Sequence, residues 1–315
     1  MRTFDVRRSL DASEHADVDR LLHDAWRADG TRPMSDHLWL DLREGGRKGF
    51  AGVIARDSGH SHVVGYCQVS RGNGSWGIDL VVHPHHRYDM HEIGPRLLEE
   101  AVRVVASEGG GHVHWWVFEA NNAHAALATA AGFAPGRVLL QMRRPLPLDG
   151  ATAALQNDLR LDEFRPGSDE EEWLSVNNAA FAQHPEQGGW TLDTIVSRES
   201  EPWFDPSLFL LHRSDGAIDG FCWMKMHGEE HDTGGPVTGE IYVIGVHPSA
   251  AAHGLGRKLA VAGLVRAHGA GAHEAMLYVD SVNERAVTMY RALGFEAHHT
   301  EHAFVGDVAG DAVAQ

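Results

Sequence analysis

The sequence predicts an α/β fold that is present twice in tandem, and two observations support this prediction. First, short motifs recur in the same order about 160 residues further along the chain, as expected for two copies of one fold. Val82-His83-Pro84 returns as Val246-His247-Pro248, and Ala131-Gly132-Phe133 returns as Leu293-Gly294-Phe295. Second, each copy alternates helix-like and strand-like segments, which indicates a mixed, mostly antiparallel sheet flanked by helices.

The first copy is expected to span residues 1–145. It opens with an amphipathic helix at residues 13–28, for which Asp11 or Ser13 is the expected cap. Its further elements are expected as strands at 50–56, 61–70 and 76–82, a helix at 93–107, a strand at 112–119, a helix at 122–131 and a closing strand.

Residues 146–159 are expected to form a linker, because Pro145 and Pro147 interrupt regular structure there. The second copy is then expected to span residues 160–305. Its elements are expected as a helix at 170–181, strands at 207–212, 218–226 and 238–246, a helix at 255–268, a strand at 275–280, a helix at 283–293 and a strand at 298–305. The small, polar residues 306–315 predict a disordered tail.

Composition and charge exclude several classes of function. The net charge of −17 argues against a nucleic-acid partner, because phosphate binding requires a basic surface. The acidity either suits a cationic substrate such as an amine or serves only to keep the protein soluble. No apolar run is long enough to span a membrane and the first residues form no signal segment, so a cytoplasmic protein is expected.

The cysteines and histidines predict neither a disulfide nor a metal site. Cys67 and Cys222 fall at equivalent strand positions in different copies, so both are expected to be buried and far apart. The histidines gather in two groups, at residues 83–91 and 298–302, but neither has the ligand spacing of a zinc site.

The loop that ends in Gly254-Leu255-Gly256 is the strongest candidate for ligand binding. It follows the strand at 238–246 and precedes a helix, whose first N–H groups and positive dipole end suit a pyrophosphate. Glycines allow the backbone to approach a ligand closely, and Arg257 and Lys258 add positive charge. Taken alone, such a loop is also compatible with an ordinary tight connection between strand and helix.

The surrounding motifs make the second copy resemble the GNAT acetyltransferase superfamily. The resemblance rests on the Val-His-Pro strand end, the Gly-x-Gly loop, Asn283, Tyr290 and the Leu-Gly-Phe turn. The superfamily's Arg/Gln-x-x-Gly-x-Gly/Ala motif falls on residues 251–256, where Ala251 replaces the usual first residue, so weakened binding of the CoA pyrophosphate is expected. In the first copy Glu92 places a carboxylate where a phosphate would lie.

Residues 181–189, 201–206, 239–246 and 276–280 are similar to tandem GNAT enzymes of actinobacteria. Those enzymes acetylate the cysteinyl amine of cysteinyl-glucosaminyl-inositol with acetyl-CoA. The resemblance implies that Glu240 is the general base, that the Val246 N–H stabilises the oxyanion and that Tyr290 protonates the departing thiolate. Direct transfer is favoured over an acyl-enzyme intermediate, because no cysteine, serine or histidine lies in a nucleophile motif.

The resemblance also implies contacts with both substrates. The acetyl-CoA contacts are expected at Leu80, Val81, Val82, Ile244, Gly245, Val246, Ala251, Ala252, His253, Gly254, Leu255, Gly256, Arg257, Asn283, Glu284, Arg285, Ala286, Val287 and Thr288. The acceptor contacts are expected at Asp36, Glu186, Lys225, Glu240 and Tyr278. No metal is expected, and the enzyme is expected to act as a monomer.

The first copy is expected to be catalytically silent, because Trp76 and Ala128 align with Glu240 and Tyr290. Two other functions stay open. A tandem GNAT enzyme could act on another amine, such as an aminoglycoside or a protein N-terminus, or the chain could be a non-catalytic regulator that binds acyl-CoA. A pure binder would need neither Glu240 nor Tyr290.

Overall fold

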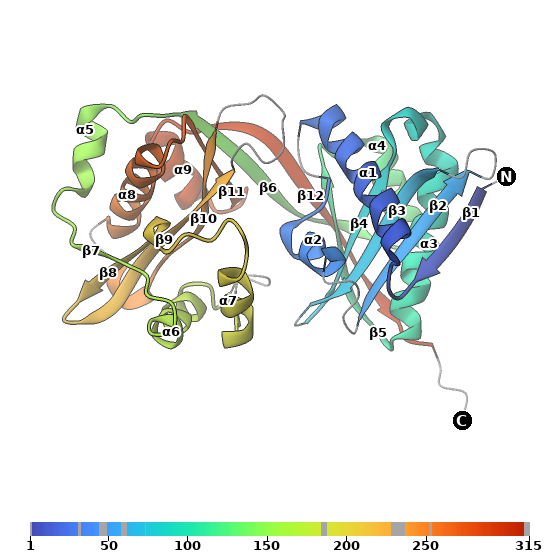
Figure 1. The fold of residues 1–315 in the computed structure, drawn as a ribbon, viewed down its shortest axis with the longest axis horizontal. Coiled ribbons are helices and arrows are strands. Elements are labelled where there is room, and N and C mark those ends of the chain that lie inside the picture. The colour runs from blue at the N-terminus through green and yellow to red at the C-terminus, as the bar shows by residue number, and fades with distance from the viewer. Residues whose placement is uncertain are drawn as a thin grey trace. The chain divides into compact units, whose positions relative to one another are not determined.

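The computed structural model describes residues 2–30, 33–43, 49–57, 62–72, 74–183, 188–227, 237–251 and 254–311. The chain forms two compact units (Figure 1), the first made of residues 1–139 and 299–315 and the second of residues 140–298. Each unit has a mixed sheet with helices on both faces, which confirms the predicted α/β class.

The sheet of the first unit has the strand order β1-β2-β3-β4-β5-β12. Neighbouring strands are antiparallel except for β4 and β5, which are parallel. Apolar side chains of α1 and α2 pack on one face of this sheet, and those of α3 and α4 pack on the other. The elements are β1 (Arg2–Arg7), α1 (Ala12–Asp29), α2 (Asp36–Arg43), β2 (Phe50–Asp57), β3 (Val63–Arg71), β4 (Trp76–Val82), the 3-10 helix η1 (Pro84–Asp89), α3 (Met90–Ser107), β5 (Gly110–Phe118), α4 (Asn122–Ala130) and β12 (Glu296–Ala309).

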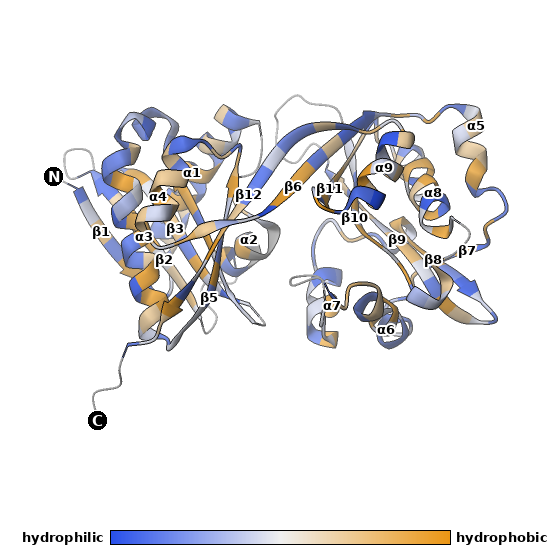
Figure 2. Ribbon diagram, turned by 180° about the vertical axis from the view of Figure 1, so that it is seen from behind, coloured by the Kyte–Doolittle hydropathy of each residue, from blue (hydrophilic) through white to orange (hydrophobic). Residues whose placement is uncertain are grey.

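The sheet of the second unit has the strand order β6-β11-β10-β9-β8-β7, in which β10 and β11 are parallel. Helices α6 and α7 cover one face, and α8 and α9 cover the other, where Figure 2 shows apolar residues concentrated on α8. The elements are β6 (Ala134–Pro145), α5 (Gly150–Ala153), η2 (Ala154–Gln156), β7 (Leu161–Glu163), α6 (Glu170–Ala180), α7 (Leu192–Glu199), η3 (Pro206–Leu208), β8 (Phe209–Ser214), β9 (Ala217–His227), β10 (Thr238–Val246), η4 (Pro248–Ala250), α8 (Leu255–Gly269), β11 (Glu274–Asp280) and α9 (Glu284–Ala292).

Local sequence signals explain where several elements begin and end. Asp11 caps α1, since its carboxylate accepts hydrogen bonds from the amides of Ser13 and Glu14, both at 2.8 Å. Gly30 ends this helix with a φ of 69°, in the left-handed region that glycine adopts without strain. Of the two caps that the sequence allows, the structure therefore uses Asp11.

Some sequence-based boundaries are wrong. Helix α3 begins at Met90, three residues before the expected start, because the chain continues into it directly from η1. The expected linker contains α5 and η2, which pack against α8. The expected tail is strand as far as Ala309, because residues 301–309 pair with β5. Strands β1 and β7 and helices α2 and α7 were not expected at all.

The last strand also changes the division of the chain. The expected second copy ends with its own closing strand, but residues 299–309 of β12 belong to the first unit. Their register with β5 runs from Glu301 opposite Phe118 to Ala309 opposite Gly110. Strand β6 makes the opposite passage, since its residues from Leu140 onward belong to the second unit.

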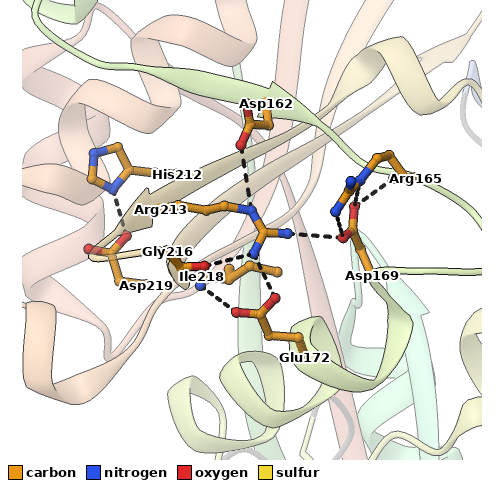
Figure 3. Close-up of polar contacts among 9 residues, drawn as sticks. All are labelled: Asp162, Arg165, Asp169, Glu172, His212, Arg213, Gly216, Ile218 and Asp219. Atoms are coloured by element: carbon orange, nitrogen blue, oxygen red, sulfur yellow. Dashed lines mark hydrogen bonds and ion pairs between the residues drawn. The ribbon is translucent and has the colours of Figure 1, made fainter.

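Arg213 on β8 links α6 to the sheet of the second unit through ion pairs (Figure 3). Its guanidinium lies 2.9 Å from Asp169 Oδ1, 2.6 Å from Glu172 Oε2 and 3.5 Å from Asp162 Oδ2. The Asp169 side chain is buried, and a hydrogen bond from Arg165 is the main reason that its pKa is lowered. This network holds α6 over the face of β9 and β10 on which the candidate site lies.

In the first unit, the buried Asp79 on β4 holds the start of α2. Its Oδ2 accepts hydrogen bonds from the Ser35 amide at 2.9 Å and from the Ser35 hydroxyl at 3.0 Å. Burial raises the pKa of Asp79 from 3.8 to about 7, although the Ser35 hydrogen bonds oppose this change. The carboxyl therefore changes charge near neutral pH inside a closed core.

We predict that Asp79 makes the stability of the protein depend on pH. The pKa of Asp79 is higher in the folded state than in the unfolded state, so between these two values the folded protein holds a proton that the unfolded chain has lost. The free energy of unfolding therefore decreases as the pH rises toward about 7. The free energy of unfolding should fall by about 1 to 2 kcal/mol between pH 5 and pH 7, relative to Asp79→Asn. Urea denaturation of both proteins at several pH values measures this. Equal slopes against pH would contradict the prediction.

Candidate active site

The parallel strands β10 and β11 diverge at the centre of the second unit. Their register runs from Thr238 opposite Glu274 to Ile241 opposite Leu277, and both strands continue beyond it, to Val246 and Asp280. The His247 amide donates a 2.8 Å hydrogen bond to the Asp219 carbonyl on the β9 side. Because successive amides of a strand point to opposite sides, the Val246 N–H points away from β9, toward the divergence.

A β-bulge at Tyr242 distinguishes β10 from its counterpart in the first unit. The register with β9 shifts between Ile241 and Val243, so Tyr242 is an extra residue in β10. The register of β3 with β4 is continuous from Gly65 opposite Val82 to Arg71 opposite Trp76.

The bulge shows that the sequence-based alignment of Glu240 with Trp76 is wrong by one residue. Glu240 lies opposite Lys225, and the corresponding pair in the first unit is Gly77 opposite Ser70. The counterpart of Glu240 is therefore Gly77 and not Trp76, because the bulge displaces the numbering by one residue. The first unit still has no carboxylate at this position.

Glu240 lies in a mostly buried polar group on the α6 face of the sheet. It is 8% exposed, and its Oε2 lies 2.7 Å from Nε2 of His227. Lys225, directly opposite on β9, is 2% exposed. Its ammonium nitrogen lies 4.7 Å from the centre of the Trp203 ring and 5.5 Å from that of Tyr242. These are cation–π distances, which partly compensate a buried charge.

His227 was missed by the sequence analysis. The sequence signal that could have found it is the alternation of side chains along β9 between the two faces of the sheet. This alternation places residues 225 and 227 on the same face as the residues opposite them on β10. Its hydrogen bond to Glu240 depends on the register between β9 and β10. That register could not be read from the sequence.

Tyr278 lies on β11, two residues beyond Met276, which is paired with Glu240. By alternation it faces the same side of the sheet as Glu240. Its hydroxyl accepts a 2.7 Å hydrogen bond from Gln141, whose own oxygen accepts one from Arg143 at 2.8 Å. The structure therefore brings together three of the five expected acceptor residues: Lys225, Glu240 and Tyr278.

The side chains of the other two expected acceptor residues lie outside the described part of the structure. Asp36 is the first residue of α2 in the first unit, and its side chain lies outside the described part of the structure. Glu186 lies outside the described residues.

Tyr290, the expected acid, lies on α9 within the apolar cluster of the opposite face. It is 5% exposed, and its ring centre lies 5.7 Å from that of Phe295. Burial raises the pKa of the Tyr290 hydroxyl above its ordinary value of 10.0. The phenol is therefore neutral across the physiological pH range and carries the proton that an acid needs.

The start of α8 has the properties that the glycine loop predicts. Gly254 is the N-cap residue, with a φ of 77° that glycine adopts without strain, and no side chain among the described residues caps the helix. Its first N–H groups therefore remain available to an anion. A guanidinium nitrogen of Arg285, on the first turn of α9, lies 3.4 Å from the Ala251 carbonyl and donates a hydrogen bond to it, so the two expected CoA-binding segments are adjacent.

The remaining expected CoA residues divide into four groups. Ile244, Gly245 and Val246 lie on β10 beyond its pairing with β11, while Asn283 caps α9 and residues 284–288 form its first turns. Leu80, Val81 and Val82 end β4 of the first unit. Ala252 and His253 lie outside the described residues.

The charges around the two loops differ. Lys258 on α8 forms an ion pair with Asp158, which offsets part of the positive charge expected at the loop. In the first unit Asp89 and Glu92, at the start of α3, both pair with Arg2. This segment is therefore occupied by an ion-pair network, in contrast to the uncapped start of α8.

Neither cysteine is part of the candidate site. Cys67 and Cys222 are free and buried, and burial raises the pKa of the Cys222 thiol to about 12. Within the described residues, no group of three or more His, Cys, Asp or Glu side chains is placed to hold a metal ion. None of the helices there is both long and apolar enough to cross a membrane.

Comparison with known proteins agrees with this geometry. The acetyltransferase (GNAT) family profile matches residues 15–133 and again residues 166–295. The chain therefore belongs to the GNAT acetyltransferase family, and it contains the family's fold twice.

Among curated proteins the chain is similar to mycothiol acetyltransferases. It is 41% identical to that of Thermobispora bispora over 268 residues, covering 85% of this chain and 88% of the relative. It is 40% identical to that of Parafrankia sp. over 323 residues, covering 96% and 98%.

Solved structures share the fold at low sequence identity. A GCN5-related N-acetyltransferase from Sphaerobacter thermophilus superposes with a TM-score of 0.66 at 20% identity, covering 97% of this chain and 96% of that one. A tandem GNAT protein from the clavulanic acid biosynthesis pathway superposes with a TM-score of 0.67 at 15% identity, covering 99% and 100%.

We predict that the two glycines of the loop differ in their effect on stability. Gly254→Ala should lower the free energy of unfolding by about 1 kcal/mol, because alanine is strained at a φ of 77°. Gly256→Ala should be neutral or stabilising by up to about 1 kcal/mol, because Gly256 is helical and its added methyl group would lie 3.7 Å from Val246. Urea denaturation measures both variants, and equal losses would contradict the assignment.

Proposed function

We propose that this chain is a mycothiol acetyltransferase. It transfers the acetyl group of acetyl-CoA to the cysteinyl amine of 1D-myo-inositol 2-(L-cysteinylamino)-2-deoxy-α-D-glucopyranoside, the last step of mycothiol biosynthesis. The observation that carries this proposal is the identity of about 40% to mycothiol acetyltransferases along nearly the whole chain. A cytoplasmic location follows from this role.

The second unit is proposed to bind acetyl-CoA. The uncapped start of α8 suits the pyrophosphate, and residues 244–246 can pair with the pantetheine chain like an added strand. The Val246 N–H, which points away from β9, can donate to the thioester oxygen as negative charge develops on it. The residues present therefore fit this substrate, with its phosphates at α8 and its thioester at the end of β10.

Glu240 is proposed to accept the proton that the acceptor ammonium must lose before it attacks. An α-amino group has an ordinary pKa of about 7.7 to 8.0, so a carboxylate suffices as its base near neutral pH. Lys225 and Tyr278 lie on the same face of the sheet as Glu240 and are proposed to contact the hydroxyl-rich acceptor. Asp36 and Glu186 complete the proposed acceptor contacts.

Tyr290 is proposed to return a proton to the departing CoA thiolate. An acceptor that enters as an ammonium loses two protons in forming an amide; one is balanced by protonation of the thiolate, and the other is released. The first unit is proposed to be catalytically silent, since Gly77 and Ala128 stand where Glu240 and Tyr290 would be and Glu92 lies in an ion pair. We propose that the enzyme is a monomer and uses no metal.

A panel of amines tests this function. The protein is incubated with acetyl-CoA and, separately, with the cysteinyl-glucosaminyl-inositol, an aminoglycoside and a peptide with a free N-terminus, and the products are identified by mass spectrometry. The proposal expects acetylation of the first at a kcat/KM well above that of the others. Preference for another amine would make the chain a GNAT enzyme of different specificity, and binding of acetyl-CoA without any product would favour a regulator.

We predict that Glu240→Gln lowers kcat/KM for the cysteinyl amine at pH 7 by about 100-fold or more, as loss of a general base usually does. The deficit should shrink at higher pH, where the free amine is already neutral. Steady-state rates from pH 6.5 to 9.5 measure both effects. A rate close to that of the wild type at pH 7 would remove Glu240 from the mechanism.

Tyr290→Phe separates acid catalysis from packing. The ring stays in the apolar cluster, so stability should change little, whereas the hydroxyl proton is lost. We expect kcat to fall by about 10-fold or more with little change in the KM for acetyl-CoA, because the lost interaction belongs to the transition state. An unchanged kcat, in an assay in which chemistry limits the rate, would make Tyr290 a packing residue.

A further inference from the structure

We infer that His227 is a positioning residue for Glu240, so that the base of this enzyme works as a histidine–carboxylate pair. This inference rests on the proposed role of Glu240. It begins from the 2.7 Å distance between His227 Nε2 and Glu240 Oε2. Because an ionised carboxylate can only accept hydrogen bonds, Nε2 carries the proton and donates it.

Of the two side chains in the pair, that of Glu240 is more deeply buried than that of His227. The Glu240 side chain is 11% exposed and that of His227 is 23% exposed. His227 is the last residue of β9, and Glu240 is the third residue of β10. The hydrogen bond therefore occupies one carboxylate oxygen, fixes the orientation of a flexible side chain and leaves Oε1 for the acceptor amine or for a water between them.

The pair also couples a second ionisation to the base. Imidazole is the ordinary side chain that changes charge near neutral pH. A glutamine at position 227 could donate the same hydrogen bond but could not become charged, so the positioning of Glu240 and the charge of residue 227 can be tested separately.

Among the described residues, the strands of the site carry several other ionisable groups on this face. They are Lys225 on β9, Tyr242 on β10, and Glu274, Tyr278 and Asp280 on β11, with Glu274 paired to Arg143 on β6. Of these, Lys225 is opposite Glu240, and its ammonium lies against Trp203 and Tyr242. Helices α6 and α7, which pack on the same face, add Glu170 and Glu199, and burial raises the pKa of Glu199 from 4.5 to about 7.

The second unit offers a matched control, His212, whose Nδ1 lies 2.5 Å from Asp219 Oδ1 (Figure 3). The two side chains are 20% and 17% exposed, similar to the His227–Glu240 pair. His212 is on β8 and pairs with Gly220 of β9. It therefore reports what loss of a histidine–carboxylate hydrogen bond does to the unit away from the proposed base.

The kinetic test compares His227→Ala, His227→Gln and His212→Gln in the full chain. We expect His227→Ala to lower kcat/KM for the acceptor by about 10- to 100-fold, as loss of a supporting hydrogen bond often does, without changing the KM for acetyl-CoA. His227→Gln retains an N–H donor at the position of Nε2, so it should recover the rate at pH 8.5 to within about 3-fold and show a shallower loss toward acid pH. His212→Gln should follow the wild-type profile.

Two outcomes would overturn the inference. One is a wild-type rate and pH profile in His227→Ala. The other is an equal loss in the alanine and glutamine variants with an unchanged profile. In a Glu240→Gln background, His227→Ala should cause no further loss, because the two residues act as one unit.

A readout without acceptor separates this inference from the proposed function. The imidazole nitrogen shifts of His227, followed by NMR against pH, should change in Glu240→Gln, whereas those of His212 should not. If the wild type acetylates no amine in the panel, the proposed function fails, and the NMR comparison still decides whether the pair exists. Unchanged His227 shifts in Glu240→Gln would reject the pair even in an active enzyme.

Discussion

Because β10 and β11 stop pairing after Ile241 and Leu277, the end of β10 can offer its outward amides to something other than a neighbouring strand. Every proposed step of the reaction depends on this divergence. It gives the thioester an N–H donor at Val246, and the chain then turns into the uncapped start of α8. The Tyr242 bulge lies where this pairing ends. It places two consecutive residues, Tyr242 and Val243, against the apolar side chains between α6 and the sheet. The first unit has a similar divergence but a regular β4, so shape alone does not make the site.

Charge is buried on the α6 face of the second unit in two different ways. Arg213 is surrounded by the carboxylates of Asp162, Asp169 and Glu172, an arrangement in which each charge has a partner and the helix is held in place (Figure 3). Lys225 lies against the aromatic rings of Trp203 and Tyr242, across from Glu240. Burying an ammonium in this way costs stability unless its environment compensates it. The first arrangement maintains the fold, whereas the second suits a site that recognises a polar substrate.

The sequence predicted the features that are encoded locally. The repeated motifs gave the tandem α/β fold, the strand at residues 238–246 has the predicted limits, and the glycine loop does lead into a helix. The amphipathic pattern of residues 13–28 correctly predicted a helix with one buried face, and Val18, Leu21 and Leu22 lie on that face. Such signals lie within a single turn or strand, so no partner from elsewhere in the chain is needed to read them.

Features that depend on pairing between distant segments could not be predicted. The bulge at Tyr242 is visible only in the register with β9, so the alignment of Glu240 with Trp76 failed by one residue. The contact of His227 with Glu240 has the same origin. Helix α2, β1 and the full length of β12 depend on neighbours that the local pattern does not reveal. The roles of Glu240 and Tyr290 were inferred from the family resemblance, because no local pattern marks a base or an acid.

The placement of β12 has a consequence for how the protein is made. The edge of β5 is completed by residues 301–309, which are translated only after residues 140–298 of the second unit. Domains near the N-terminus ordinarily fold first during synthesis. Here the first unit must wait, with one strand edge unpaired, while the whole second unit is translated. Exposed strand edges invite association with other chains, so a newly made first unit is most vulnerable to aggregation during this interval. The two halves, although they repeat one fold, are therefore obliged to mature together.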